Sequence, residues 1–273
     1  ITLAIQDGSF FKNAALKKAF EHTKKNDSRI NFIGLLSKGN VHSSLEHLNA
    51  LIKFSEQEGL ADKVNLHLIT DGRDSPPQSA IELLANISKT QLASISGRYY
   101  AMDRDKHWER TQRYYQILTG EGHSIAVDNI EAHIKKTYAK NLNDEYVEPT
   151  LISHTGEQFS CIKDNDAVIF FNFREDRMRQ IVEPFINAQF DKFPIKKFSN
   201  LYTATMISYD DKFKVPVFFL TKKIENPLSK ILAEHRKSQF RVAETEKYAH
   251  ITYFFNGQRE TPFENEYRIL IPS

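Results

Sequence analysis

Two arginines that lie six residues apart, Arg98 and Arg104, carry the most readily interpreted chemistry in this sequence. They belong to the segment Ser-Gly-Arg-Tyr-Tyr-Ala-Met-Asp-Arg-Asp, which follows an apolar run at 92–95 that is typical of a buried strand. A guanidinium group presents five N–H donors in a rigid fork that matches the oxygens of a carboxylate or a phosphate. Two such groups on one loop indicate a site for an anion.

Three other apolar runs end in similar chemistry, in the segments 37–43, 71–74 and 174–177. In open α/β sheets, ligands bind beyond the carboxyl ends of the strands. Seven side chains are expected at or just past those ends: His42, Arg73, Asp74, Arg98, Arg104, Arg174 and Arg177. Solvated loop residues with local salt bridges are an alternative for each one, but this alternative explains the whole set less well.

Arg174 and Arg177 are three residues apart and share one face of a helix that we expect to begin at Glu175. Positive charges in a first helical turn oppose the helix dipole, at about 0.3–1 kcal/mol each. An anion held between both side chains and the helix terminus would offset this cost. A salt-bridged helix start is the alternative.

The roles of three further residues are less constrained by their spacing. Asp74 is by default a helix cap, although a carboxylate in an anion pocket can also orient or deprotonate a substrate hydroxyl. His42 precedes a capping box formed by Ser43 and Glu46. Its ring could bond a phosphate, but a lone loop histidine usually has no such role. Lys247 lies in a charged run that would ordinarily be a solvated loop.

Strands and helices are expected to alternate along most of the chain. The predicted strands are 30–36, 64–69, 92–96, 167–173 and 201–209, and the predicted helices are 13–26, 43–58, 75–84, 108–118, 125–139 and one from 175 onward. This order predicts an α/β fold with a mostly parallel sheet and helices on both faces. The pattern changes after Val215, where a helix at 228–235 and strands at 240–243 and 250–256 are expected. We therefore predict one domain over 1–220 and a partial domain over 221–273.

The composition is that of a globular protein, with 40% hydrophobic and 26% charged residues among 273. A net charge of +2 argues against nucleic-acid binding through a broad basic surface. The single cysteine, Cys161, excludes an internal disulfide and fits a reducing compartment. No apolar run approaches the roughly 20 residues of a membrane-spanning helix, and no secretory signal is evident. The residues alone thus predict an α/β domain that binds a small phosphorylated or carboxylated anion.

At these residues the sequence resembles the cofactor-independent (2,3-bisphosphoglycerate-independent) phosphoglycerate mutases. The matching segments are 34–43, 71–77, 96–105, 146–150, 166–177, 243–256 and 268–273. The resemblance implies a phosphotransferase domain up to about residue 220, inserted into an alkaline-phosphatase-like domain to which 221–273 return. It also implies interconversion of 3-phosphoglycerate and 2-phosphoglycerate through a phosphoserine intermediate beside two manganese ions, or magnesium in some members.

By this resemblance, eight residues line the phosphoglycerate site: His42, Arg73, Asp74, Arg98, Arg104, Arg174, Arg177 and Lys247. The arginines would hold the carboxylate and the phosphate, Asp74 would manage the glycerate hydroxyls, and Lys247 would stabilise the phosphoryl group in transfer. We expect that replacing Arg98 or Arg177 by alanine weakens binding and leaves the fold intact.

Three departures from the family pattern are present. Lys38 and Asn40 replace an aspartate and a glycine in the loop that carries His42, and Glu175 stands where many members have proline. The family's serine nucleophile and metal ligands are not found in this chain, so none of its own residues is expected to bind the metal.

We therefore expect the substrate-binding portion of a cytoplasmic, monomeric mutase, inactive by itself, with no nucleic-acid or membrane partner. A non-catalytic module that binds a phosphorylated anion is the alternative.

Overall fold

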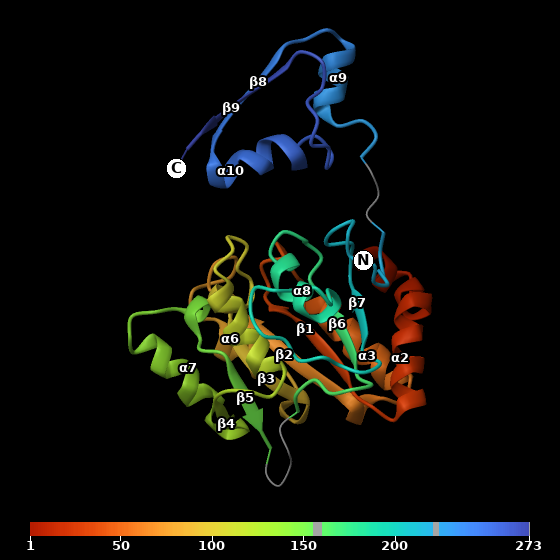
Figure 1. Ribbon diagram of the computed structural model, residues 1–273, viewed down its shortest axis with the longest axis vertical. Coiled ribbons are helices and arrows are strands. Elements are labelled where there is room, and N and C mark those ends of the chain that lie inside the picture. The colour runs from red at the N-terminus through yellow and green to blue at the C-terminus, as the bar shows by residue number, and fades with distance from the viewer. Residues whose placement is uncertain (155–159, 221–223, 273) are drawn as a thin grey trace. The chain divides into compact units, whose positions relative to one another are not determined.

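The computed structural model describes residues 1–154, 160–220 and 224–272 (Figure 1). The chain divides into two compact units, Ile1–Leu220 and Thr221–Ser273. Among the described residues, no helix combines the length and the apolar character that crossing a membrane would require.

A seven-stranded sheet in the order β4-β5-β3-β2-β1-β6-β7 forms the centre of the first unit. Its strands are β1 (Ile30–Leu36), β2 (Val64–Thr70), β3 (Leu92–Gly97), β4 (Ser124–Ala126), β5 (Thr150–Ser153), β6 (Ala167–Phe170) and β7 (Tyr202–Thr205). Strands β3, β2, β1, β6 and β7 are parallel to one another. Strand β5 runs antiparallel to β3, and β4 pairs in parallel with β5. The predicted mostly parallel sheet is confirmed.

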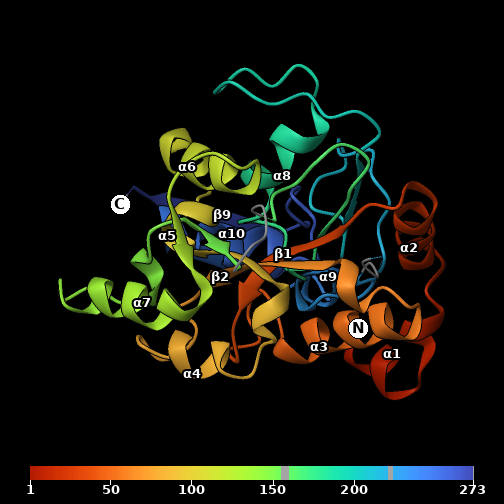
Figure 2. The same cartoon turned by 90° about the horizontal axis from the view of Figure 1, so that it is seen from below.

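Helices cover both faces of this sheet (Figure 2). One face carries α1 (Thr2–Gln6), α2 (Ala14–Asn26), α3 (Leu45–Gln57), α4 (Ala80–Leu84) and α7 (Ile130–Tyr138), and the other carries α6 (Trp108–Leu118) and α8 (Arg179–Ile186). A short helix, α5 (Arg98–Ala101), follows β3 directly. Single 3₁₀ turns lie at Ser9–Lys12, Ala61–Lys63, Lys89–Gln91, Val127–Asn129 and Asp144–Tyr146.

The central strand β1 shows why the sheet is buried on both sides. All seven of its residues are buried, and its side chains alternate between two apolar cores. Ile30 and Phe32 pack with the helices of one face, whereas Ile33 and Leu35 pack with those of the other. A strand covered on both faces reads as a continuous apolar run, which is the pattern in this segment.

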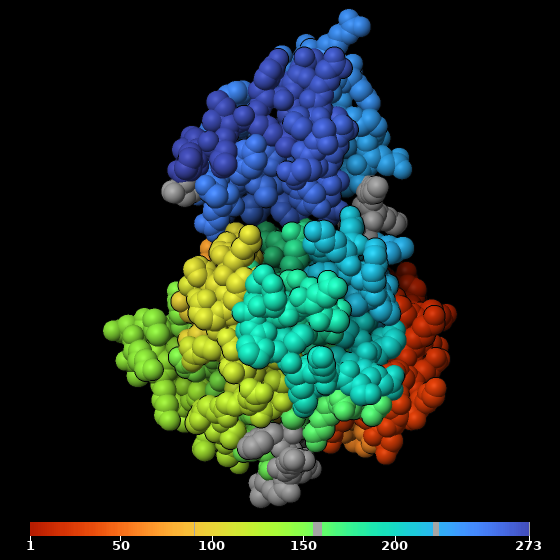
Figure 3. Space-filling view, viewed as in Figure 1, coloured from red at the N-terminus to blue at the C-terminus, as the bar shows by residue number. Residues whose placement is uncertain are grey.

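On one face, α6 and the segment from α8 onward pack against each other. In Figure 3 they form adjoining yellow and teal surfaces. The ring of Tyr115 lies 5.1 Å from that of Phe185 and 5.4 Å from that of Phe193, measured between centroids. Aromatic pairs at this spacing add packing energy beyond the area that they bury. This contact fixes the segment after β6 relative to the helix that follows the Arg98 loop.

Four local expectations in the first unit were wrong. The predicted helix 125–139 begins only at Ile130, because β4 and a 3₁₀ turn occupy its first residues. The helix expected from Glu175 begins at Arg179. Ser43 does not cap α3, because its hydroxyl donates to the backbone carbonyl of Leu35. The helix expected near residue 75 begins at Ala80.

The second unit contains α9 (Leu228–Glu234), β8 (Gln239–Glu244), α10 (Thr245–Ala249), a π-helical turn η6 (His250–Phe254) and β9 (Glu266–Ile271). Strands β8 and β9 pair in parallel. The strand expected at 250–256 was wrong, because Thr252 and Asn256 are its buried residues and are four apart, which is a helical spacing. The Thr252 hydroxyl also donates to the carbonyl of Tyr248, four residues earlier.

Candidate functional site

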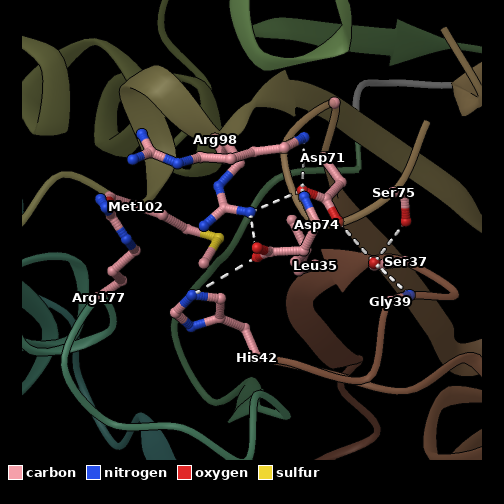
Figure 4. Close-up of polar contacts among 12 residues, drawn as sticks. Leu35, Ser37, Gly39, His42, Asp71, Asp74, Ser75, Arg98, Met102 and Arg177 are labelled. Atoms are coloured by element: carbon pink, nitrogen blue, oxygen red, sulfur yellow. Dashed lines mark hydrogen bonds and ion pairs between the residues drawn. The ribbon is translucent and has the colours of Figure 1, made fainter. Parts of the chain in front are cut away.

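The carboxyl ends of four neighbouring parallel strands converge at one edge of the first unit's sheet. Ser37 follows β1, Asp71 follows β2, Arg98 follows β3, and Asn172 lies two residues beyond β6. Because these strands are parallel and adjacent, their ends meet, and side chains distant in sequence become neighbours. Figure 4 shows Arg98 beside Asp71 and Asp74, with His42 next to Asp74.

A buried charge cluster is centred on Arg98, whose side chain is only 3% exposed. Its Nη1 donates over 2.6 Å to Asp71 Oδ1 and over 2.6 Å to Asp74 Oδ2. Burial alone would lower the pKa of Arg98, but the hydrogen bonds and charges of Asp74 and Asp71 outweigh it and raise the pKa above its usual value. Arg98 is thus a fixed cation held by two carboxylates.

Asp71 links the cluster to the backbone of the adjoining turn. Its carboxylate accepts hydrogen bonds from the Ser37 hydroxyl (2.6 Å) and from the backbone N–H groups of Arg73 (3.1 Å) and Asp74 (3.0 Å). Burial raises the pKa of Asp71, but these bonds and Arg98 outweigh burial and leave the pKa below its usual value. Asp71 therefore remains ionised.

Asp74 is not a helix cap, contrary to the default interpretation of its spacing. The helix that follows, α4, begins at Ala80, and its first N–H groups are bonded by another carboxylate. Asp144 Oδ2 accepts from the N–H groups of Ser79 and Ala80, both over 2.8 Å. The Asp74 side chain is 20% exposed, so its carboxylate is accessible to a ligand.

His42 is an uncharged member of the cluster at neutral pH. Its Nε2 lies 3.7 Å from Asp74 Oδ2, and its Nδ1 lies 3.7 Å from Asp176 Oδ1. Burial, followed by the charge of Arg98, lowers the pKa of His42 to about 4. A neutral imidazole can donate one hydrogen bond and accept another, so His42 can orient an anion without adding charge.

A second carboxylate, Asp176, bridges two further arginines. Its Oδ2 accepts from Arg104 Nη1 over 2.6 Å, and Arg174 reaches both oxygens, through Nε (3.0 Å) and Nη2 (3.3 Å). Burial raises the pKa of Asp176, but Arg174, His42 and Arg104 outweigh it and lower the pKa. The two arginines are thereby held in a defined geometry.

The loop that carries Arg104 is anchored by Asp103, which is 5% exposed. The Asp103 carboxylate accepts from the backbone N–H groups of Asp105 (3.1 Å) and His107 (2.9 Å). It also accepts from the side-chain amide of Gln180, over 2.9 Å. Since Gln180 belongs to α8, this contact connects the Arg104 loop to the segment that carries Arg174.

Arg177 differs from the other arginines of the cluster. Among the described residues, its guanidinium forms no salt bridge, and its one hydrogen bond runs from Nη1 to the backbone carbonyl of Met102, over 3.1 Å. Burial, and then the charges of Arg104 and Arg98, lower the pKa of Arg177 to about 10. This part of the site carries excess positive charge.

The expected helix-terminus anion site at Arg174 and Arg177 was wrong. Both arginines precede α8, which begins at Arg179, and they lie in an irregular turn in which the Met178 N–H donates to the carbonyl of Glu175. They have different partners, so they do not act as a pair on one helical face.

Among the predicted site residues, one of the first unit lies outside the buried cluster and one belongs to the second unit. Arg73 has an exposed side chain that lies 3.7 Å from Glu145, although its charge is near enough to lower the pKa of Arg177. Lys247 belongs to the second unit, where it is exposed on α10. The cluster of the first unit brings together the remaining six residues: His42, Asp74, Arg98, Arg104, Arg174 and Arg177.

Sequence reasoning missed the carboxylates that organise the arginines, Asp71 and Asp176. An acidic residue is not an obvious candidate in a pocket expected to hold an anion. A signal was nevertheless present, because Asp71 directly follows a predicted strand and Asp176 lies between Arg174 and Arg177. Fixed arginines need counter-charges, and these two positions supply them.

The departures in the loop that carries His42 have structural explanations. Asn40 adopts a left-handed backbone conformation with φ of 52°, which asparagine tolerates better than most residues. Lys38 is exposed and pairs over 2.9 Å with Glu82 of α4. Lys38 therefore makes its ion pair at the surface.

Within the described ranges, no group of three or more His, Cys, Asp or Glu side chains could hold a metal ion. The acidic residues of the cluster are engaged by arginines instead. No step that depends on a metal can be assigned to these side chains.

Comparison with known proteins places this geometry in a family. Residues 1–211 match the family model described as "BPG-independent PGAM N-terminus". A 2,3-bisphosphoglycerate-independent phosphoglycerate mutase of Salinibacter ruber is 44% identical over 286 residues, covering 100% of this chain and 54% of that protein. The mutase of the same name from Clostridium novyi is 45% identical over 282 residues, with the same coverage.

A solved structure supports the relationship. Leishmania mexicana phosphoglycerate mutase, determined at low cobalt concentration, superposes with a TM-score of 0.80 at 26% identity and covers 99% of this chain and 52% of its own. The chain spans about half the length of the curated relatives it matches. The chain belongs to the 2,3-bisphosphoglycerate-independent phosphoglycerate mutase family and matches the model of its N-terminal part.

Proposed function

We propose that this chain is the substrate-binding portion of a phosphoglycerate mutase that interconverts 3-phosphoglycerate and 2-phosphoglycerate. Membership of the family supports the reaction. The observation that carries the proposal is the setting of Arg177, whose guanidinium donates to the neutral carbonyl of Met102 over 3.1 Å. Burial, and then repulsion from Arg104 and Arg98, lower its pKa to about 10. An anion bound beside Arg177 would relieve this repulsion, so the site favours a ligand with more than one negative charge.

The charges of the cluster suit phosphoglycerate. Each of its three aspartates is bonded to at least one arginine, whereas Arg177 contacts a neutral carbonyl. Phosphoglycerate carries a carboxylate and a phosphate, and guanidinium groups can bind either through paired N–H donors. We assign Arg177, Arg104 and Arg174 to these anionic groups and neutral His42 to a hydrogen bond with a phosphate oxygen.

Asp74 is assigned to the glycerate hydroxyl. Its Oδ2 is held by Arg98, while within the described part of the chain its Oδ1 accepts no hydrogen bond. A carboxylate with one free oxygen can accept the hydroxyl proton when that hydroxyl receives a phosphoryl group. Arg73 and Lys247 are proposed to contact the substrate as well. For these two the support is the family resemblance.

The complete enzyme is proposed to use manganese or magnesium beside a phosphoserine. A divalent metal fits the cobalt named for the solved relative, but the described residues of this chain offer no ligand group for it. The part played by this chain is to bind and orient the substrate and to accept a proton at Asp74.

The domain assignment and the cellular setting are also proposals. The division into units Ile1–Leu220 and Thr221–Ser273 supports a phosphotransferase domain followed by part of an alkaline-phosphatase-like domain. The single cysteine supports a reducing compartment such as the cytoplasm, and the net charge of +2 supports the lack of a nucleic-acid partner. A monomer without a membrane partner is proposed as well.

Calorimetric titration of the chain with 3-phosphoglycerate tests the binding role. Binding is expected to be stronger than that of glycerate or of inorganic phosphate, because each of these lacks one of the two anionic groups. Failure to bind 3-phosphoglycerate more tightly than phosphate would contradict the proposal.

The alternative is a module that binds the anion without catalysis. The family resemblance, by which the serine nucleophile and the metal ligands are not found among the residues of this chain, supports inactivity of this chain alone. Mutase activity is measured with manganese present, and no turnover is expected. Robust turnover by the chain alone would show that its own residues suffice for catalysis.

A further inference from the structure

Resting on the proposed function, we propose that Asp71 is a positioning residue that sets the place of Asp74 and Arg98 for recognition of the substrate hydroxyl. Asp71 itself is buried, with a side chain that is 0% exposed, so it acts through its neighbours. It connects three loops that are separate in sequence (Figure 4).

The hydrogen bonds of Asp71 are divided between its two oxygens. Oδ1 accepts from Arg98 Nη1 and from the backbone N–H groups of Arg73 and Asp74, over 2.6, 3.1 and 3.0 Å. Oδ2 accepts from the hydroxyl of Ser37 over 2.6 Å. Both oxygens are therefore needed as acceptors. An asparagine offers one acceptor oxygen and two N–H donors, so it cannot reproduce this arrangement.

Ser37 extends the connection to the loop that carries His42. Its oxygen accepts from the backbone N–H of Gly39 (2.9 Å) and lies 2.8 Å from the hydroxyl of Ser75. The turn after β2 is thereby attached to the loop after β1. Asp71 holds the backbone of this turn through its hydrogen bond with the Asp74 N–H. It also holds the Asp74 side chain indirectly, because both carboxylates accept a hydrogen bond from Arg98.

The division of Arg98 between two carboxylates gives Asp71 its proposed effect. Arg98 Nη1 lies 2.6 Å from both Asp71 and Asp74, so neither carboxylate alone determines where it lies. Without the charge of Asp71, the guanidinium is free to follow Asp74. The direction of Asp74 Oδ1, which accepts no hydrogen bond from the residues that the structure describes, is then no longer fixed.

A ligand that lacks the hydroxyl provides the test. The probes are 3-phosphoglycerate and 3-phosphooxypropionate, which has the same carboxylate and phosphate but no hydroxyl. The chain is expected to prefer 3-phosphoglycerate by roughly tenfold or more, the factor that a hydrogen bond to a charged group supplies. In Asp71→Asn this preference is expected to fall to within about threefold, and Asp74→Asn serves as the positive control.

Asp166→Asn is the matched control. Asp166 is a buried aspartate of the same unit, 4% exposed, that accepts from the backbone N–H groups of Arg29 (3.0 Å) and Lys163 (2.9 Å). It immediately precedes β6, so it lies at the opposite edge of the sheet. This variant is expected to lose stability and to keep the preference for the hydroxyl. A purely structural role for Asp71 predicts the same outcome for Asp71→Asn.

The outcomes separate this inference from the proposed function. If the unaltered chain fails to bind 3-phosphoglycerate, the proposed function fails. If it binds both probes equally, or if folded Asp71→Asn keeps the full preference, the positioning role is overturned. Should Asp71→Asn not fold, Ser37→Ala replaces it, since this change removes one of the hydrogen bonds to Asp71 and keeps the charge of that carboxylate. A partial loss of preference is then expected, and an unchanged preference overturns the proposal.

Discussion

The Arg177 guanidinium donates its hydrogen bond to the backbone carbonyl of Met102, over 3.1 Å. This partner is neutral, whereas Arg98 and Arg104 are paired with carboxylates. The site thus contains arginines that hold it together and one arginine, Arg177, that forms no salt bridge with any residue of the described ranges. The two kinds are expected to respond differently to substitution.

Replacement of Arg177 by glutamine is expected to weaken 3-phosphoglycerate binding by about tenfold or more, because a charged hydrogen-bond donor to the anion is lost. The free energy of unfolding should fall by no more than about 1 kcal/mol, since one hydrogen bond to Met102 is lost while repulsion from other arginines is relieved. Calorimetry and urea unfolding measure the two effects. Arg113→Gln, an exposed arginine paired with Glu148, is the control. Unchanged binding in Arg177→Gln would remove Arg177 from the site.

Replacement of Arg98 by alanine is expected to weaken binding and also to destabilise the first unit by about 3–5 kcal/mol, because it leaves two carboxylates without their buried partner. The sequence predicted an intact fold for this variant, and the burial of Arg98 changes that prediction. Urea unfolding at neutral pH measures the loss. A stability equal to that of the unaltered chain would show that Asp71 and Asp74 are hydrated well enough without Arg98.

Arg98 and Arg177 have different roles that the sequence did not predict, although it did predict the strands and loops that carry them. Continuous apolar runs such as 30–36 and 64–69 identified the central strands, because a strand buried on both faces is apolar along most of its length. The strand ends then identified the loops that bear the cluster. Helix starts were predicted less well, since α4 begins where Asp144, 64 residues later in the chain, supplies its cap.

Within the site, residue type predicted the cations but not their individual roles. Arg98 and Arg177 look alike in the sequence, and only the fold determines that one meets Asp71 and the other a backbone carbonyl. The contacts of Asp71 with Arg98 and of Asp176 with Arg104 join residues that are 27 and 72 positions apart, and spacing along the chain does not reveal such contacts. The role of Lys247 stays a prediction.

Stability is expected to fall as the pH decreases from about 6.5 to about 4. His42 and His47 have pKa values lowered to about 4 and His67 to about 3, with burial as the first cause in each case. Their usual value is about 6.5. In this window the unfolded chain therefore binds protons that the folded chain does not bind. Each histidine lowers the free energy of unfolding by at most about 1.4 kcal/mol per pH unit within this window.

The carboxylates act in a lower window. The pKa values of Asp71 and Asp176 are lowered in the fold, so their stabilisation is present above their unfolded pKa, about 3.9, and is lost as the pH falls through the folded values. Urea unfolding between pH 8 and 4 covers the window of the histidines. His42→Gln should reduce the slope between pH 6.5 and 4 relative to the unaltered chain. A slope equal to that of the unaltered chain would contradict a neutral, buried His42.

Gly39 is predicted to be the residue of the His42 loop that tolerates substitution least. A Cβ atom at this position would lie 2.1 Å from the backbone carbonyl oxygen of Asp74, so Gly39→Ala must displace the turn that carries Asp74. We expect weakened 3-phosphoglycerate binding and a loss of about 1–3 kcal/mol of stability. The neighbouring Asn40→Gly is the matched control, because glycine adopts the φ of 52° without strain. Asn40→Gly should bind 3-phosphoglycerate like the unaltered chain. Equal effects of the two changes would show that the close contact between Gly39 and the Asp74 carbonyl is not the reason that Gly39 cannot be replaced.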